Sequence, residues 1–308
     1  MNHRMFRRLR RVLIATALIL ALSSFPTFVM ASDGFSEEIT KMELLQMDQS
    51  NMLDTLLASG MKLPEHYQLH RDTAEYFVKT YTPMLLNGEV SAGNLPFNYA
   101  PSNAMLSDLE STLIHLHLLD SADRVMPTRY VLQNSIPIGV WSNSYTNYNC
   151  YAYSLGLTWW MNPGDQSGTP FDITDPISDI ADTVLDDLTY SGFWGYKTTT
   201  KPSVLPDPWF RVICIRKDTD NVDYHFMRMS RSLNTWEHKP GGTQPLQWNF
   251  SSPGSAVWSN ECVVNGTSYS PTVTYESTIY YIVYKGIHDP GIQQQKLSPE
   301  ALETLFRG

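Results

Sequence analysis

The chain has 308 residues, with 31 acidic residues against 22 lysines and arginines, and its formal net charge is −9 at pH 7. Such an acidic chain is poorly suited to a nucleic acid backbone or to an anionic membrane surface, and no basic stripe interrupts the pattern. Nucleic-acid binding is therefore disfavoured.

Residues 1–31 have the composition of an export signal. Five arginines lie within the first 11 residues, an apolar run extends from Val12 to Leu22, and the small residue Ala31 closes the segment. A basic start, an apolar middle and a small final residue are typical of a secretory signal, so cleavage is predicted after Ala31. The apolar run is short for a membrane span, although an uncleaved N-terminal anchor stays open.

Export would also change the charge of the mature chain. Cleavage removes 5 arginines and no acid, so 17 basic residues remain against 31 acidic ones and the formal charge becomes −14. We therefore expect an acidic protein that is secreted or lies in the cell envelope, with no stable membrane span after cleavage.

Residues 32–128 are predicted to form a helical region ahead of the main domain. Apolar residues recur there at helical spacing, and Gly60 is a suitable stop for the first helix. Such a region could serve as a propeptide, a docking module or a lid on the later domain. The predicted helices cover residues 44–57, 65–79 and 103–119.

Four histidines lie in this helical region: His66, His70, His115 and His117. His66 and His70 have the spacing of two metal ligands on one helix turn, but no acidic residue lies between them as in a zinc peptidase. We interpret all four as surface or core histidines, with metal binding as the alternative.

Cys150 is the residue around which residues 129–308 are interpreted. Turn-forming residues occupy 142–147, and residues 151–157 are mostly small, apolar or aromatic. This pattern predicts a loop that runs into a helix N-terminus. A thiol there is favoured as thiolate by the helix dipole and by unpaired amides, whereas burial favours the neutral thiol. A reactive Cys150 therefore needs a cationic or basic partner.

His225 is the candidate partner. Residues 210–216 and 223–229 have the composition of strands, and the turn-forming cluster 217–221 between them predicts a hairpin.

A second turn leads from this hairpin to another histidine. A four-residue loop would pair Ser230 with Thr235 on the next strand. In that register His225 lies opposite Pro240, and His238 falls diagonally on the same face of the sheet. Two histidines could then approach one thiol.

This order of residues resembles the papain-like superfamily, in which a cysteine at a helix start is followed by a histidine on one strand and a polar residue on the next. It is most similar to the NlpC-type branch of bacterial cell-wall peptidases and amidases, whose third residue is often histidine. That branch has Asp and Ser beside the cysteine, where this chain has Asn149 and Tyr151. Residues 149–153, 223–226 and 236–241 also resemble uncharacterised secreted bacterial proteins of this kind.

The resemblance covers about the last 170 residues, from Leu132 onward, which suits one domain. It implies an α+β fold: residues 129–308 would form a papain-like domain, in which a helix carrying the cysteine packs on an antiparallel sheet carrying the histidine. The expected activity is hydrolysis of an amide bond in a peptide, an isopeptide or peptidoglycan.

The resemblance also implies residue roles. Cys150 would be the nucleophile, His225 the general base and acid, and His238 the residue that orients His225, with Glu237 and Asp223 as rivals for that last role. The backbone amide of Cys150 would be one oxyanion donor, and the second would come from Asn147 or Asn149.

Two hypotheses that assign the domain to other functional classes stay open. The domain could be a catalytically inactive binding module, which is distinguished by a Cys150 that is buried and distant from His225. Alternatively, Cys150, His225 and His238 could bind zinc, because all three are normal zinc ligands.

The disulfide state is open as well. Cys214 and Cys262 both fall in strand-like segments, and an oxidising compartment would allow them to pair and leave Cys150 free. The other pairings are equally compatible with the sequence, as are three reduced thiols with Cys150 as a small core residue.

The remaining segments give the outline of the domain. Asp175 and Pro176 have the types that begin a helix, as cap and first residue, and residues 272–284 alternate as a strand. Residues 159–168 form a turn-rich loop that could wall a cleft or cover a hydrophobic plug. His288 is expected in an exposed turn, and residues 298–306 carry the signals of a short helix.

Overall fold

The computed structural model describes residues 39–94, 96–120, 134–138, 142–203, 210–230, 235–260, 262–264, 267–269 and 273–286. The export signal, the domain boundary at 128/129, His288 and the C-terminal helix fall outside these ranges. Ile39–Gly308 form one compact unit. Within the described part, no helix has both the length and the apolar character needed to cross a membrane.

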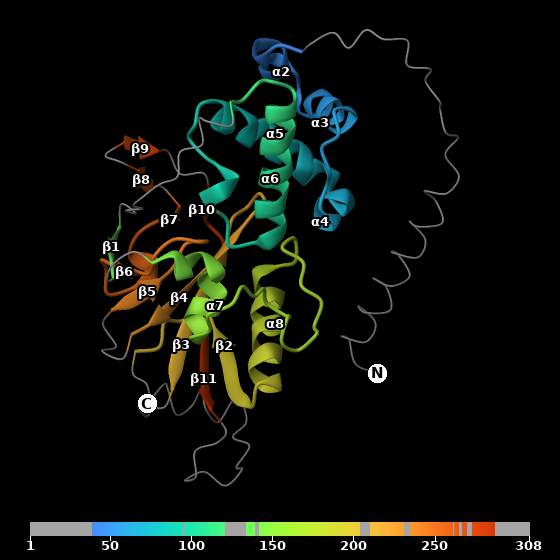
Figure 1. Ribbon diagram of the computed structural model, residues 1–308. Helices are drawn as coiled ribbons and strands as arrows, with labels where there is room; N and C mark the ends of the chain where they lie inside the picture. Colours follow the sequence, from blue (N-terminus) through green and yellow to red (C-terminus); the bar gives the residue numbers. More distant parts are fainter. Residues whose placement is uncertain are drawn as a thin grey trace, which may run out of the picture. The chain divides into compact units, whose positions relative to one another are not determined.

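An antiparallel sheet of seven strands is the centre of this unit, in the order β1-β6-β5-β4-β3-β11-β2 (Figure 1). With the helices, it confirms the α+β class. Two small sheets pair β7 with β10 and β8 with β9. The strands are β1 (Ser135–Pro137), β2 (Phe193–Thr198), β3 (Arg211–Lys217), β4 (Tyr224–Met229), β5 (Trp236–His238), β6 (Leu246–Trp248), β7 (Trp258–Ser259), β8 (Cys262–Val264), β9 (Thr267–Tyr269), β10 (Thr274–Tyr275) and β11 (Tyr280–Gly286).

The two predicted strand connections are confirmed. β3 and β4 form the expected hairpin, and the Ser230 amide donates to the Thr235 carbonyl at 2.9 Å, which sets Met227 opposite His238. The prediction of one strand over residues 272–284 is wrong, because the chain leaves the extended pairing between β10 and β11. Strand β2 had not been predicted.

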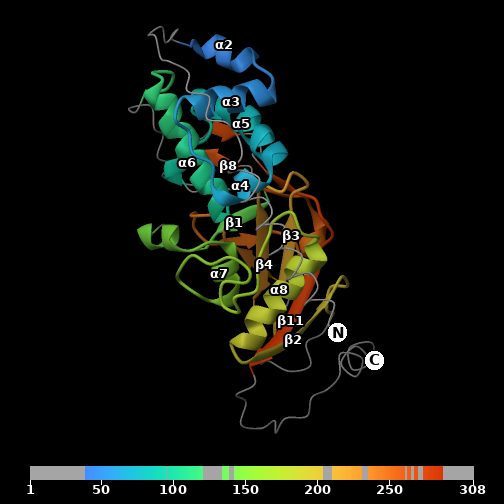
Figure 2. The same ribbon diagram turned by 90° about the vertical axis from the view of Figure 1, so that its right-hand side faces the viewer.

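In the described part of the helical region, residues 39–94 and 96–120, five helices lie at one end of the sheet (Figures 1 and 2). Two predicted helices are interrupted. Asp48 accepts a hydrogen bond from the Asn51 amide at 2.8 Å and so begins a new helix, and His70 has non-helical backbone angles of φ −126° and ψ 72°. The helices are α2 (Lys41–Gln46), α3 (Gln49–Ala58), α4 (Glu65–Leu69), α5 (Arg71–Leu86) and α6 (Ala100–His115).

Two further helices, α7 (Cys150–Leu155) and α8 (Ile177–Tyr190), cover one face of the sheet. α8 begins one residue later than predicted: Pro176 occupies the cap position, without a side-chain cap, and Asp175 lies before it. Short 3₁₀ turns occur at Ala92–Asn94, Asn143–Asn147 and Pro253–Ser255.

The alternation of side chains along the strands divides the core into two clusters. Residues that face α7 and α8 pack with Cys150; they are Ile213, Ile215, Tyr224, Phe226, Ile282 and Tyr284. Residues of opposite parity, among them Val212, Cys214, Met227, Trp236 and Val283, belong to the cluster that contains the apolar residues of α2–α6. The helical region and the sheet therefore share one core, and the contacts below depend on that.

Candidate functional site

Cys150 lies at the first position of α7, as the sequence predicted. Asn149 is the cap: its Oδ1 accepts from the Ala152 amide at 3.1 Å. Its Nδ2 donates to the carbonyls of Asn98 and Met161 at 2.9 and 2.8 Å. Asn149 is therefore committed to holding the helix start and does not serve as an oxyanion donor here.

The thiol of Cys150 is fully buried. Its Sγ lies 3.9 Å from the carbonyl oxygen of Tyr224, and among the described residues no hydrogen bond joins it to a histidine ring. Burial raises the pKa of the Cys150 thiol well above its usual value, nearby Asp223 raises it further, and Lys239 acts in the opposite direction. The cysteine in this arrangement is a neutral thiol.

The side chains of His225 and His238 meet each other on the side of strand β4 that faces away from Cys150. His225 Nε2 lies 2.8 Å from His238 Nδ1, and His238 Nε2 lies 2.7 Å from the hydroxyl of Ser135 on β1. Burial lowers the pKa of His225 well below its usual value, with a further decrease from His238, and lowers the pKa of His238 to about 3. Both rings are therefore neutral at pH 7.

Asn98, from the segment just before α6, connects the cysteine to the histidines. Its Oδ1 accepts from the backbone amides of Cys150 and Gly241 at 3.3 and 2.8 Å. Its Nδ2 lies 3.4 Å from His225 Nδ1. Because two backbone donors hold Oδ1, the orientation of the amide is fixed and Nδ2 faces the imidazole.

This orientation determines the protonation of both rings. An amide nitrogen only donates, so its 3.4 Å contact favours the tautomer in which His225 Nδ1 accepts and Nε2 carries the hydrogen. Asn98 Nδ2 also donates to Asp223 Oδ2 at 3.0 Å and to the Tyr275 hydroxyl at 3.3 Å. His225 then donates to His238 Nδ1, and His238 donates to Ser135. The histidines form a directed chain whose free basic nitrogen, His225 Nδ1, points toward Asn98.

The second amide donor comes from Gly241 rather than from Asn147 or Asn149. Gly241 has a φ of 42°, in the left-handed region that favours glycine, and this turns its N–H toward Asn98 Oδ1. Two amides from separate elements thus converge on one carbonyl oxygen. The acceptor is the side-chain amide oxygen of Asn98, held by Cys150 at 3.3 Å and by Gly241 at 2.8 Å.

Asp223, one of the rival orienting residues, makes no hydrogen bond to either ring among the described residues. Its carboxylate accepts from both nitrogens of Asn98, from the Tyr99 amide and from the Tyr275 hydroxyl. Burial raises the pKa of Asp223 to about 7 against the lowering effect of these donors. Its role is to fix Asn98 and Tyr275, whose ring stacks on His225.

Glu237, the other rival, lies away from the histidines. Its Oε2 binds Arg228 at 2.8 Å and the Tyr153 hydroxyl at 3.1 Å. His238 is therefore the residue that contacts His225.

Lys239 is a charged residue of the site to which the sequence analysis had assigned no role. It is fully buried, and its Nζ donates to the carbonyls of Tyr148 and Gly241 and lies 4.4 Å from the Tyr148 ring centre. Burial lowers the pKa of Lys239 to about 7, and the cysteine favours its charged form. The only sequence signal was its position directly after His238.

Two alternatives left open for the cysteines are not supported. Cys214 is a free, buried thiol, which excludes the Cys214–Cys262 disulfide as one of the possible pairings; the side chain of Cys262 lies outside the described part. The proposed zinc ligands Cys150, His225 and His238 do not gather their donor atoms, because the histidine nitrogens bond to each other. The metal-compatible group within the described ranges is a different one.

Comparison with known proteins gives no relative: no family model, no curated protein and no solved structure matches the chain. The functional assignment therefore depends on the residues and their geometry.

Proposed function

We propose that the protein is a cysteine-dependent amide hydrolase of papain-like type, present here in a closed form. The observation that carries the proposal is the amide of Asn98. Its oxygen accepts from the Cys150 and Gly241 amides, and its nitrogen faces His225 Nδ1. A scissile amide would need the same two contacts, one for its developing oxyanion and one for its leaving nitrogen.

In the open form, His225 Nδ1 would take the proton of the Cys150 thiol, and the thiolate would attack the substrate carbonyl carbon. His225 would return the proton to the leaving amine as the thioester forms, and water would then release the acid. His238 would hold the Nε2–H tautomer of His225 and Ser135 would hold His238, which is the orienting role of a third triad member.

Asn98 belongs to the helical region, whose helices share a core with the sheet, so residues 96–99 of that region would act as a lid over the cysteine. The burial of Cys150 and the high pKa of its thiol fit an enzyme that is inactive until residues 96–99 withdraw. The substrate class in this proposal is a peptide, an isopeptide or peptidoglycan, encountered after export and cleavage at Ala31.

A second candidate is a catalytically inactive binding module that keeps the architecture. Three observations favour it: Cys150 is buried, its thiol contacts the Tyr224 carbonyl, and His225 lies on the side of β4 that faces away from the cysteine. In that case the thiol has only a packing role, and removal of Asn98 would not make it reactive.

Alkylation of Cys150 by iodoacetamide distinguishes the two candidates. We would compare the full chain with its Asn98→Ala and Asn98→Ala/His225→Ala variants at pH 6, and follow each cysteine by peptide mass spectrometry. At pH 6 a free thiol with a pKa of about 8.5 is only about 0.3% thiolate. A thiolate paired with His225 should therefore react roughly 100-fold faster in the Asn98→Ala variant than in the double variant.

Cys214 is the internal control, because it is an equally buried free thiol. Labelling of Cys150 and Cys214 at the same rate in the Asn98→Ala variant would indicate general loosening or an inert core cysteine, and the hydrolase proposal would be abandoned. If Cys150 instead reacts faster than Cys214, hydrolysis of peptidoglycan by the Asn98→Ala variant would identify the substrate, with Cys150→Ser as the inactive control.

A further inference from the structure

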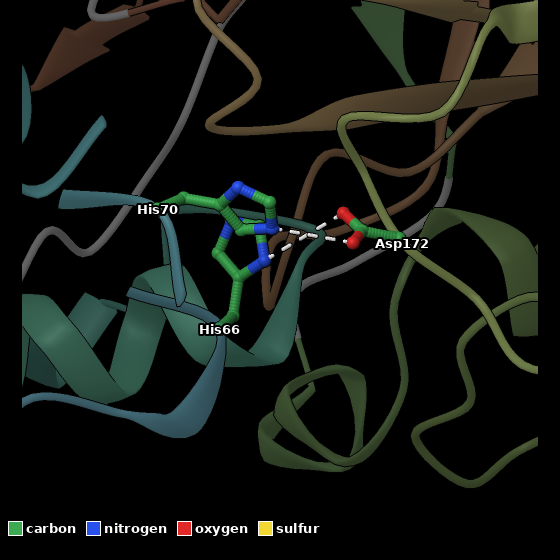
Figure 3. Close-up of side chains that lie close together, drawn as sticks. All are labelled: His66, His70 and Asp172. Carbon is green, nitrogen blue, oxygen red and sulfur yellow. Dashed lines mark hydrogen bonds and ion pairs between the residues drawn. The ribbon is translucent and has the colours of Figure 1, made fainter. Parts of the chain in front are cut away.

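A second histidine pair lies far from Cys150 in the sequence and has a carboxylate as its partner. His66 on α4 and His70 at the break before α5 point toward Asp172, which lies in the loop between α7 and α8 (Figure 3). His66 Nδ1 lies 3.8 Å from Asp172 Oδ1, and His70 Nε2 lies 3.2 Å from Asp172 Oδ2. The three donor atoms all fall within 4.8 Å of one another.

These separations suit one zinc ion. Zinc binds histidine nitrogen and carboxylate oxygen at about 2.0–2.2 Å, which places tetrahedral neighbours about 3.3 Å apart. His70 Nε2 lies 3.2 Å from Asp172 Oδ2 and His66 Nδ1 lies 3.8 Å from Oδ1, both near that value. The three donor atoms lie within 4.8 Å of one another, so the side chains would draw closer together around one ion. Two histidines and one carboxylate, with a remaining position for water, are a common zinc ligand set.

His66 gives an independent reason to look for a ligand. Its side chain is only 7% exposed, and Nδ1, the nitrogen that faces Asp172, is too far from it for a hydrogen bond. The other ring nitrogen, Nε2, is buried without a hydrogen-bond partner as well, although a metal at Nδ1 would not reach it. Buried polar groups are normally satisfied, so a ring with neither nitrogen bonded in the described structure is unusual.

A simple ion pair does not account for the group. Contact between His70 and Asp172 explains those two residues but leaves His66 unexplained. Thr174 also fixes the orientation of the Asp172 carboxylate, because Oδ1 accepts from the Thr174 amide and hydroxyl at 2.9 and 2.8 Å. Such second-shell bonds are what hold a metal-binding carboxylate in place.

We propose that His66, His70 and Asp172 form a zinc site that ties the helical region to the loop between α7 and α8. The ligands come from two parts of the chain about 100 residues apart, so the ion would act as a cross-link between them. The site does not depend on the hydrolase proposal, because it shares no residue with the Cys150 network.

Zinc titration of the full chain tests the site. The protein would be stripped with EDTA, dialysed, and titrated with Zn²⁺ by calorimetry, with bound zinc measured by atomic mass spectrometry after gel filtration. We expect one bound equivalent. His70→Gln and Asp172→Asn should each weaken binding by at least about 100-fold, since even second-shell changes cost about 10–100-fold. His115→Gln, at an exposed helical histidine, is the matched control and should bind as the parent does.

A thermal measurement gives a second readout. Zn²⁺ should raise the melting temperature of the parent and of His115→Gln, but not that of His70→Gln. His70 and Asp172 are about one-third exposed, so these variants should fold, and melting in EDTA checks that they do. Absence of zinc binding, or equal binding by His70→Gln, would overturn the proposal. Zinc lost only on Cys150→Ser would assign the metal to the thiol instead.

Discussion

The two histidine pairs differ in what each ring touches. His225 and His238 are almost fully buried and hydrogen-bond to each other, and neither ring contacts a carboxylate in the described structure. His66 and His70 lie nearer the surface and share the carboxylate of Asp172. The first pair forms a chain that can pass a proton in one direction, whereas the second presents lone pairs and a negative charge to a common point.

The position of an aspartate makes this difference. Asp223 lies close to the first pair but is occupied by Asn98, Tyr99 and Tyr275, so it organises the surroundings of the rings. Asp172 lies directly against the second pair. The same residue types therefore support different chemistry, according to whether the carboxylate reaches the imidazoles.

The largest effect is expected from Asp223→Asn. At pH 8, above its pKa of about 7, the buried Asp223 carboxylate accepts from four hydrogen-bond donors. The NH₂ group of an asparagine at this position would face some of these donors without being able to accept from them. Unsatisfied buried donors cost about 1–3 kcal/mol each, and removal of the buried charge offsets part of this, so we expect a net loss of about 2 kcal/mol in the free energy of unfolding. Urea denaturation measures it; a loss below about 1 kcal/mol would show that the carboxylate does not organise this region.

A pH-dependent effect is expected from His238. Its pKa is about 3 in the folded protein and about 6.5 when unfolded, so the unfolded chain binds the extra proton. The stability that depends on the neutral ring is fully present above about pH 6.5 and is lost as the pH falls toward 3. The slope is at most about 1.4 kcal/mol per pH unit.

The His238→Gln variant should therefore show a shallower decrease in unfolding free energy between pH 6.5 and 4 than the parent, although it is less stable at pH 7. Denaturation curves at several pH values give both quantities. Parallel pH profiles for the two proteins would contradict a buried neutral His238.

The smallest effect is expected from Asp172→Asn without zinc. Asp172 and His70 are each about one-third exposed, and a partly solvated ion pair contributes about 1 kcal/mol or less. Urea denaturation in EDTA should show a loss in that range. A loss as large as that of Asp223→Asn would remove the contrast between the two aspartates.

The sheet part of the site could be predicted from the sequence. Alternating side chains and turn residues of known length fix a strand register, and this was sufficient to bring His225 and His238 together. The start of α7 at Cys150 also followed from local residue types.

The parts that were missed depend on contacts between distant segments. Asn98 binds Asp223 across 125 residues, and His70 meets Asp172 across 102. No local periodicity encodes such pairings, because they arise only when the helices dock on the sheet. The histidine spacing on α4 was visible, but the third ligand was not.

The turn at Gly241 has a consequence for the sheet as a hydrogen-bonded ladder. Continued in its register, the pairing of β4 with β5 would bring Tyr224 opposite Gly241 and close one more rung. That rung is absent: the Gly241 N–H goes to Asn98, and the Tyr224 carbonyl receives the Cys150 thiol. Cys150 thus lies where the pairing of β4 with the chain after β5 has ended. A change that let the Gly241 amide bond to the Tyr224 carbonyl would remove both of these contacts without altering any polar side chain of the site.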